Sequence, residues 1–194
     1  MNWQGNILKV IFSLFLIFLF CKQTLANDLW TIDKNISSIE FEVPVLFANN
    51  VIGKFNTFDG FVSLDLSNQN NNKALINVSI KSLDLNYKRY KDLVLSEVFF
   101  DAQKFPLGLI DTNNFNFNYE DDKINLIGEL TIKGKSQNIP IDIEVIKLAN
   151  ELVQVKSEIL FSRNEFNIGT GSWKNTSILK DEIKIKANIF LFKE

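Results

Sequence analysis

Two pairs of neighbouring carboxylates are the residues whose type and spacing come nearest to catalytic chemistry. Asp121 precedes Asp122, and Asp181 precedes Glu182. General acid–base or glycosidase chemistry needs two carboxylates that converge in a cleft. Both pairs lie in turn or strand-entry contexts, and their spacing does not bring them together. We interpret them as solvated charges.

The segment Gly169-Thr170-Gly171 is a candidate phosphate loop. It lacks the trailing glycine of a dinucleotide motif and the Lys-Ser/Thr of a P-loop, so we interpret it as a turn. No D-x-D-x-D-G calcium loop occurs in the sequence.

Histidine is absent from all 194 residues. Its absence excludes Ser-His-Asp and Cys-His nucleophile systems, a histidine general base and every histidine-ligated metal site. The single cysteine, Cys21, lies within the first 26 residues, so the rest of the chain has no thiol chemistry. We therefore expect a protein that is not an enzyme and needs no cofactor or metal.

The charge balance is nearly neutral. The chain has 21 Lys and Arg against 23 Asp and Glu, which makes its formal net charge −2 and argues against a nucleic-acid partner. Phenylalanine is abundant, with 18 residues against 3 Trp and 3 Tyr. The length leaves room for one domain or at most a small second one.

The first 26 residues resemble a secretory signal peptide. Lys9 is followed by an unbroken apolar run from Val10 to Phe20, which has the length of a signal-peptide core and is too short to span a membrane. We expect cleavage after Ala26, which leaves a mature domain of residues 27–194 in a bacterial periplasm. An uncleaved anchor is the alternative, and the bulky Phe20 before Cys21 argues against a lipoprotein.

The mature chain alternates apolar and polar residues with the period of a β-strand. Eight stretches share this period, and their apolar positions are Ile39 to Phe47, Val62 to Leu66, Ile76 to Ile80, Phe115 to Tyr119, Ile124 to Ile132, Ile139 to Val145, Val153 to Phe161 and Ile183 to Leu191. Turns are expected at Asp59-Gly60, at 68–73, at Asp121-Asp122 and at Lys133-Gly134-Lys135.

One stretch has helical spacing instead. Leu93, Val94, Val98 and Phe99 predict a short helix over 91–96, followed by a loop that Pro106 closes. We expect this segment to lie across one end of a barrel. The pattern thus predicts an all-β, antiparallel domain of about eight strands, either a closed barrel or a sandwich. It leaves open whether that domain carries a lipid or is a structural sandwich.

Five segments, in order, resemble the YceI-like family of periplasmic proteins. They are WTIDKNISSIEFEV (30–43), GKFNTFDGFVSLDL (53–66), SIKSLDLNYKRYKDLVLSEVFFDAQKFP (79–106), GELTIKGKSQNIPIDIEV (128–145) and SRNEFNIGTGSW (162–173). The resemblance implies a lipocalin-like barrel that binds polyisoprenoid lipids. Three histidines that are usual in the family are replaced by Ile36, Val45 and Asp92, and a usual glycine is replaced by Asn167.

Aromatic residues are the expected liners or lids of the ligand site, with ordinary core packing as the alternative for each. They are Phe41, Phe55, Phe58, Phe61, Phe99, Phe100, Phe105, Phe161, Phe166 and Trp173. Arg163 matches a family position. It is expected either to hold a ligand head group at the barrel mouth or to pair with Asp92 or Glu97 and fix the lid.

The function that these features favour is an exported carrier or storage protein for a polyisoprenoid or isoprenoid quinone, with no catalysis. Burial of a long hydrocarbon in a barrel of about eight strands supplies the binding energy. The alternatives are an envelope-stress interaction module whose core is filled by its own phenylalanines, and an outer-membrane barrel. We expect transient contact with the inner membrane or a membrane protein, and leave open a homodimer.

Overall fold

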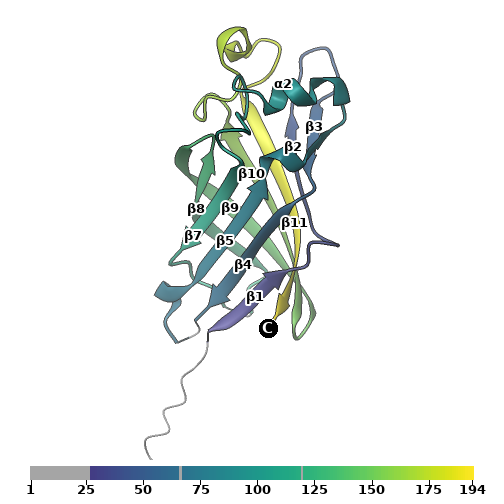
Figure 1. Cartoon of the computed structure of the whole chain (residues 1–194). Coiled ribbons are helices and arrows are strands. Elements are labelled where there is room, and N and C mark those ends of the chain that lie inside the picture. The colour runs from purple at the N-terminus through teal and green to yellow at the C-terminus, as the bar shows by residue number, and fades with distance from the viewer. Residues whose placement is uncertain (1–26, 66, 119) are drawn as a thin grey trace, which may run out of the picture.

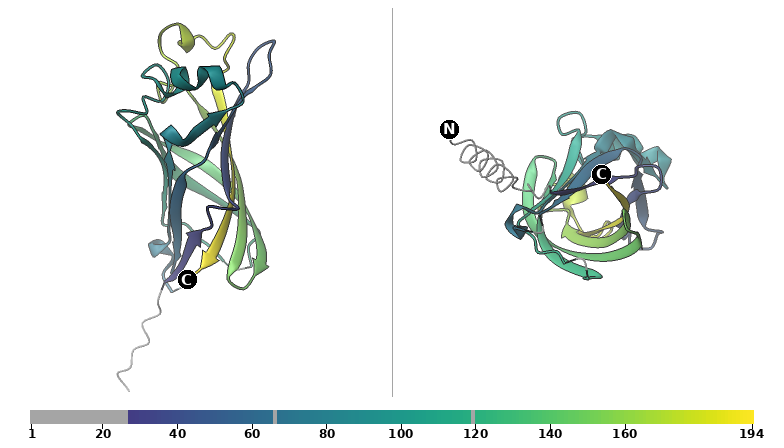
Figure 2. Two further views of the ribbon diagram at one scale, coloured as in Figure 1. Left: turned by 45° about the vertical axis from the view of Figure 1, so that its right-hand side comes forward. Right: turned by 90° about the horizontal axis from the view of Figure 1, so that it is seen from below.

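The computed structural model describes residues 27–65, 67–118 and 120–194 as one closed antiparallel barrel. The predicted signal peptide, Cys21, Leu66 and Tyr119 lie outside these residues. The sheet closes because β1 pairs with β4 on one edge and with β11 on the other. In the view along the axis the strands form a ring (Figure 2). The prediction of an all-β barrel is confirmed.

Eleven strands are formed by the described residues, and each pairs antiparallel with its neighbours. Their bounds are β1 Asp28–Ile32, β2 Ser38–Val43, β3 Val51–Phe55, β4 Phe58–Leu64, β5 Lys73–Ser79, β6 Leu83–Leu85, β7 Leu107–Asn113, β8 Lys123–Ile132, β9 Lys135–Ala149, β10 Leu152–Ser162 and β11 Glu182–Lys193.

The eleven strands make an eight-stranded barrel because each of three barrel strands is interrupted and forms two shorter strands. β1 and β2 follow one another along the same edge of β11, opposite residues 191–193 and 184–188. β3 and β4 pair with them in turn, and β6 and β5 pair with β3 and β4. The connections between β3 and β4 and between β5 and β6 are hydrogen-bonded to each other, since Asn56 N donates to Ser82 O and Ser79 N donates to Thr57 O. The predicted number of about eight strands is therefore confirmed.

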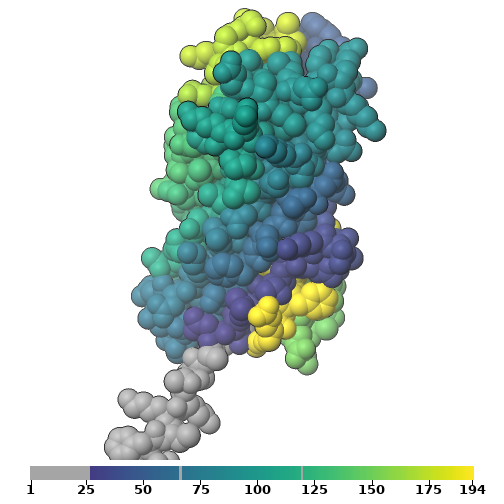
Figure 3. All heavy atoms as spheres, viewed as in Figure 1, coloured from purple at the N-terminus to yellow at the C-terminus, as the bar shows by residue number. Residues whose placement is uncertain are grey.

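One short helix, α2 (Lys91–Leu95), covers the end of the barrel at which β2, β3 and β6 lie (Figure 1). Short 3-10 helices are η1 Gln69–Asn71, η2 Ile80–Ser82, η3 Lys88–Tyr90 and η4 Gly171–Lys174. We call this end, with residues 86–106 and 163–181, the lid end. In the space-filling view these teal and yellow-green segments cover it (Figure 3). The predicted helix over 91–96 and its place are confirmed.

Two of the predicted turns are confirmed in detail. Lys133 and Gly134 both have positive φ, of 52° and 70°, which is the conformation of a two-residue hairpin turn between β8 and β9. A Cβ at Gly134 would lie only 2.5 Å from the Phe105 ring, which is too close for any residue larger than glycine. The asparagine-rich segment 68–73 joins β4 to β5 through η1, as expected.

Several boundaries were predicted wrongly. Asp59 and Gly60 lie within β4 rather than in a turn. Phe115 and Phe117 alternate as in a strand and are buried, but they belong to a loop after β7. β2 ends at Val43, because Val45 forms only an isolated bridge with Leu179.

Four strands, β1, β3, β6 and β7, were not predicted at all. The first three have only three to five residues, too few to display a clear period. The seven residues of β7, LGLIDTN, mix apolar and polar side chains without alternation. Pairing with neighbouring strands, rather than local pattern, determines these four segments.

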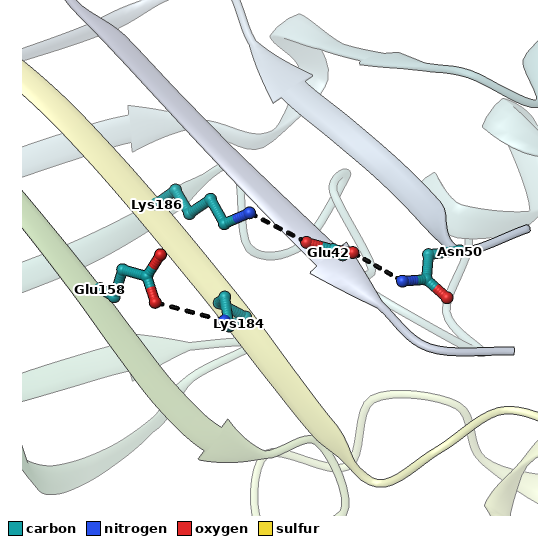
Figure 4. A network of polar contacts seen from close by, with 5 residues as sticks. All are labelled: Glu42, Asn50, Glu158, Lys184 and Lys186. Atoms are coloured by element: carbon teal, nitrogen blue, oxygen red, sulfur yellow. Dashed lines mark hydrogen bonds and ion pairs between the residues drawn. The ribbon is translucent and has the colours of Figure 1, made fainter.

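The outer face of the barrel carries charged side chains opposite one another on adjacent strands (Figure 4). Lys186 on β11 pairs with Glu42 on β2 at 3.1 Å, and Lys184 pairs with Glu158 on β10 at 3.2 Å. The amide of Asn50 donates to Glu42 at 2.6 Å, and this bond and Lys186 lower the pKa of the Glu42 carboxyl. Among the described residues, no helix is long and apolar enough to cross a membrane.

Candidate ligand-binding cavity

A cavity of about 560 Å³ occupies the half of the barrel opposite α2. This volume lies within the range typical of small-molecule sites. Its wall combines aliphatic residues from β8 to β11 with Trp30, Phe61, Phe115 and Phe117. The aliphatic part comprises Ile124, Leu126, Ile141, Ile143, Val145, Val153, Val155, Ile159, Ile189 and Leu191. The cavity is therefore a mainly apolar chamber.

The wall follows from the strand period, since every second residue of each strand points inward. On β9 these are Ile141, Ile143 and Val145, whereas the exposed Asp142 and Glu144 between them point outward. Ala74 on β5 and Ala187 on β11 also line the chamber. Where such small side chains replace aromatic rings, the barrel interior is not filled.

The chamber reaches solvent at the end opposite the lid. Its lining there includes Glu120 and residues 147–150, which are the last three residues of β9 and the first of the β9–β10 turn, and all of these are exposed. We call these residues the mouth. Glu120, Lys147 and Asn150 supply polar groups at the opening, whereas the chamber behind them is apolar.

Among the described residues that line the chamber, one has a buried polar side-chain atom without a partner. Thr112 Oγ1 donates to Ala74 O at 3.3 Å and Ser157 Oγ donates to Asp142 O at 2.8 Å, so both hydroxyls are satisfied within the protein. Trp30 is only 4% exposed, and its indole Nε1–H has no acceptor among the described residues. An unpaired buried donor is costly, and an acceptor on a ligand would remove that cost.

A second void of about 70 Å³ lies on the lid side of the chamber and shares Ile76, Ile110, Ile159 and Ala187 with its wall. Phe41, Phe55 and Phe100 close it on the lid side as a triangle of rings, with centroids 5.7 to 6.4 Å apart. Aromatic rings at these distances pack favourably edge to face. The lid half is thus nearly filled by its own side chains.

Above the triangle, one ring pair attaches the lid to the barrel and a second joins the two lid segments to each other. Phe161 at the end of β10 packs against the fully buried Phe166, with centroids 5.2 Å apart. Phe99, after α2, packs against Trp173 in η4 at 5.5 Å. Backbone bonds join the same segments, because Gly169 N and Thr170 N both donate to Val98 O.

Arg163 lies at the centre of the lid end and is fully buried. Its guanidinium donates to the carbonyls of Lys180, Ile168 and Leu179 at 2.9 to 3.0 Å, with longer bonds to Gly169 and Asn175. Burial lowers the pKa of Arg163. Its hydrogen-bond partners are these carbonyls and not the expected carboxylates of Asp92 or Glu97, and it lies at the end opposite the mouth.

The eleven expected site residues separate into three groups. Phe61 lines the large chamber. Phe41, Phe55, Phe100 and Phe161 line the small void. Those that line neither are Phe58, Phe99, Phe105, Phe166, Trp173 and Arg163.

The aliphatic liners of the chamber were missed as site residues, although their alternation placed them on one face. Ile141, Ile143 and Val145 carry that signal in the sequence, and so do Val153 and Val155. The expectation favoured phenylalanine because of its abundance. In the structure the phenylalanines gather mainly in the lid half, where they fill space.

The family positions that differ in this chain lie outside both cavities. Ile36 is exposed in the turn before β2, Val45 bridges Leu179, and Asp92 is in the first turn of α2. Asn167 has a φ of 54°, a conformation that favours glycine and that asparagine tolerates better than most residues. That conformation explains why asparagine serves at this position.

The carboxylates considered at the outset do not converge. Asp121 and Asp122 lie in the turn before β8. Asp181 accepts hydrogen bonds from Ser162 Oγ at 2.7 Å and from Asn164 N at 3.2 Å, so it caps the end of β10. The described residues contain no group of three or more Cys, Asp or Glu side chains placed to hold a metal ion.

Two sequence relatives match a little more than half of the chain. A UPF0312 protein of Vibrio vulnificus is 33% identical over 110 residues, which are 57% of this chain and 58% of that protein. A UPF0312 protein of Vibrio cholerae is 30% identical over the same shares. The match thus spans less than two thirds of the length of these relatives.

Solved structures share the fold over nearly their whole length. BcnA of Burkholderia cenocepacia is 28% identical with a TM-score of 0.73, covering 82% of this chain and 98% of BcnA. A polyisoprenoid binding domain from Saccharophagus degradans is 11% identical with a TM-score of 0.69, covering 85% and 98%. The second likeness concerns the fold alone. Residues 30–191 also match the model of the YceI-like domain, so the chain belongs to the YceI-like family.

Proposed function

We propose that this protein is a non-catalytic carrier or storage protein that holds a long isoprenoid lipid in its barrel. The apolar chamber of about 560 Å³, open at one end, is the observation that carries the proposal. Burying hydrocarbon yields about 25 cal/mol per Å², so a long apolar chain is the class of ligand that such a wall favours. The fold it shares with a polyisoprenoid binding domain adds support.

Within this class of ligand, an isoprenoid quinone is the finer candidate, because it carries oxygen atoms that accept hydrogen bonds. The support for this finer proposal is the unpaired Nε1–H of Trp30 in the wall. The apolar chain would lie among the aliphatic residues, and a carbonyl or hydroxyl oxygen would accept from Trp30.

The setting proposed for this activity is the bacterial periplasm, reached by cleavage of a signal peptide after Ala26. The support is the cationic residue Lys9 and the apolar run from Val10 to Phe20. Loading of the barrel there requires transient contact with the inner membrane or with a membrane protein, because a free isoprenoid lipid does not cross water readily.

Lipid identification and probe displacement test the proposal. Protein purified from its native membrane-containing extract should release an isoprenoid lipid in native mass spectrometry. It should also bind a fluorescent apolar probe that polyisoprenoid alcohols displace. If neither lipid nor probe binding is found, the alternative of a non-binding envelope module is preferred.

A plugging variant locates the binding. Ala187→Phe places a ring in the shared wall of both cavities, so it should lower probe affinity by about tenfold or more. Ile127→Phe adds similar bulk at a side chain that is 61% exposed on β8, and it should bind the probe as the wild type does. Equal affinity for all three proteins would place the probe outside the barrel.

A further inference from the structure

Two loops project beyond the barrel at the lid end and are bonded to each other. They are residues 44–50, between β2 and β3, and residues 175–181, between η4 and β11. Leu46 N donates to Ile178 O at 2.9 Å, and Lys180 N donates to Pro44 O at 3.0 Å. Figure 2 shows both loops extending past the strands at the same end as α2. They form one projecting unit, which we call the tip.

The tip exposes large apolar side chains. Phe47 is 98% exposed, Ile178 is 65% exposed and Leu46 is 41% exposed. Phe47 also has a φ of 59°, which is rare for an aromatic residue. Such a backbone conformation persists only where its surroundings hold it, and such sites are often functional. The hydrogen bonds between the two loops hold the backbone beside Phe47.

Cationic and aromatic residues flank the tip. The Tyr87 hydroxyl donates to Asn49 O at 3.3 Å, which places the adjacent cations Lys88 and Arg89 beside the loop. Lys180 lies within the tip itself, and Lys174 belongs to η4. All four cations are exposed.

The exposed cations of the lid end, which include Lys104, outnumber its exposed acidic residues, which are Asp92, Glu97 and Glu165. Asp84, on β6, is also exposed, and Asp181 accepts hydrogen bonds from Ser162 and Asn164. Tyr90 is 41% exposed and lies under the Arg89 guanidinium at 4.8 Å, and Trp173 is 38% exposed. Aromatic rings and cations around exposed aliphatic residues are the composition of surfaces that bind at a membrane interface.

We propose that the tip docks on an anionic lipid surface, with Phe47 and Ile178 entering the interfacial layer and the flanking cations facing the head groups. The opposite end is less suited to this role, because acidic residues outnumber cations around the mouth and an anionic bilayer repels them. The acidic residues there are Glu120, Asp121, Asp122 and Glu151, and the exposed cations are Lys123 and Lys147. The cavity mouth therefore faces away from the membrane when the tip is docked. The docking rests on the tip residues and does not require a loaded chamber.

Flotation with vesicles tests the proposal. The purified protein should float with vesicles of phosphatidylcholine mixed with phosphatidylglycerol, and only weakly with vesicles of phosphatidylcholine alone. Salt should weaken the binding because it screens the cations. No flotation with the mixed vesicles would overturn the proposal, including the case in which the tip instead binds a protein.

Matched variants identify the surface. Phe47→Ser with Ile178→Ser should lower vesicle affinity by about tenfold or more, since two exposed apolar side chains lose their burial. Ile127→Ser, on the outer wall, should leave it unchanged. Equal losses in both proteins would overturn the proposal. Displacement of the apolar probe from the chamber should be the same in all of them, which separates this test from the test of ligand binding.

A fluorescent reporter provides a second readout. In Phe47→Trp the added emission should shift to shorter wavelength on addition of mixed vesicles, and lipids brominated near the head group should quench it. Emission that stays at the wavelength of a water-exposed indole, although the protein floats, would overturn the proposed contact.

Discussion

The lid half and the mouth half of this barrel share the same strands but differ in what fills them. In the lid half Phe41, Phe55 and Phe100 leave a void of only about 70 Å³, whereas in the mouth half aliphatic side chains leave about 560 Å³. An eight-stranded barrel encloses a space that side chains can just fill. The size of the inward residues therefore decides which half is core and which is a chamber.

The polar chemistry of the two halves differs in the same way. The lid half buries a cation, Arg163, and satisfies it with carbonyl oxygens. The mouth half leaves a buried donor, Trp30 Nε1, without an acceptor among the described residues. A satisfied polar network stabilises a fixed structure, whereas an unsatisfied group provides a place for a ligand atom.

Removal of Arg163 should produce the largest loss of stability. Arg163→Leu leaves at least three carbonyls without their short hydrogen bonds, so we expect the free energy of unfolding to fall by about 5 kcal/mol. Guanidinium denaturation measures this. Arg89→Leu is the control, because Arg89 is exposed and its guanidinium lies over the Tyr90 ring, and it should change stability little. A small effect of Arg163→Leu would show that the lid end does not depend on this network.

Truncation of a ring in the triangle should come next. Phe100→Ala removes a side chain that is only 6% exposed and should cost about 3–5 kcal/mol, and it should join the small void to space under the lid. Ile143→Ala, in the wall of the chamber, should cost less, about 1–2 kcal/mol, because that side chain already borders empty space. Equal costs would contradict the division into a filled half and a hollow half.

The smallest effect is expected on ligand choice. Trp30→Phe keeps an aromatic ring in the wall but removes the indole N–H, so affinity for a decyl quinone should fall by about three- to tenfold relative to a decyl benzene of the same chain length. Competition against a fluorescent apolar probe measures both. The Trp30 indole resonance of the wild type should move downfield with the quinone alone. If Trp30→Phe leaves the ratio of the quinone and benzene affinities unchanged, the Trp30 N–H does not select ligands that carry oxygen.

Prediction from sequence succeeded where a pattern is long and local. Apolar positions alternate over 139–145, 153–161 and 183–191, within the long strands β9, β10 and β11. The helix over 91–95 follows from the spacing of Leu93, Val94 and Val98. It failed where tertiary pairing decides. The strand β6 has three residues and exists because it pairs with β3, and the alternation of Phe115 and Phe117 belongs to a loop that folds against the chamber.

By itself the sequence determined the class of the fold, the inward face of the long strands and the absence of histidine chemistry, because these depend on residue type and local period. Only the tertiary structure decided where the barrel is hollow. The period places Phe41 and Val145 equally inside, but their neighbours across the axis decide whether each meets a ring or open space. It also decided the role of Arg163, whose five carbonyl partners come from residues 168–180 and meet only when the lid end folds.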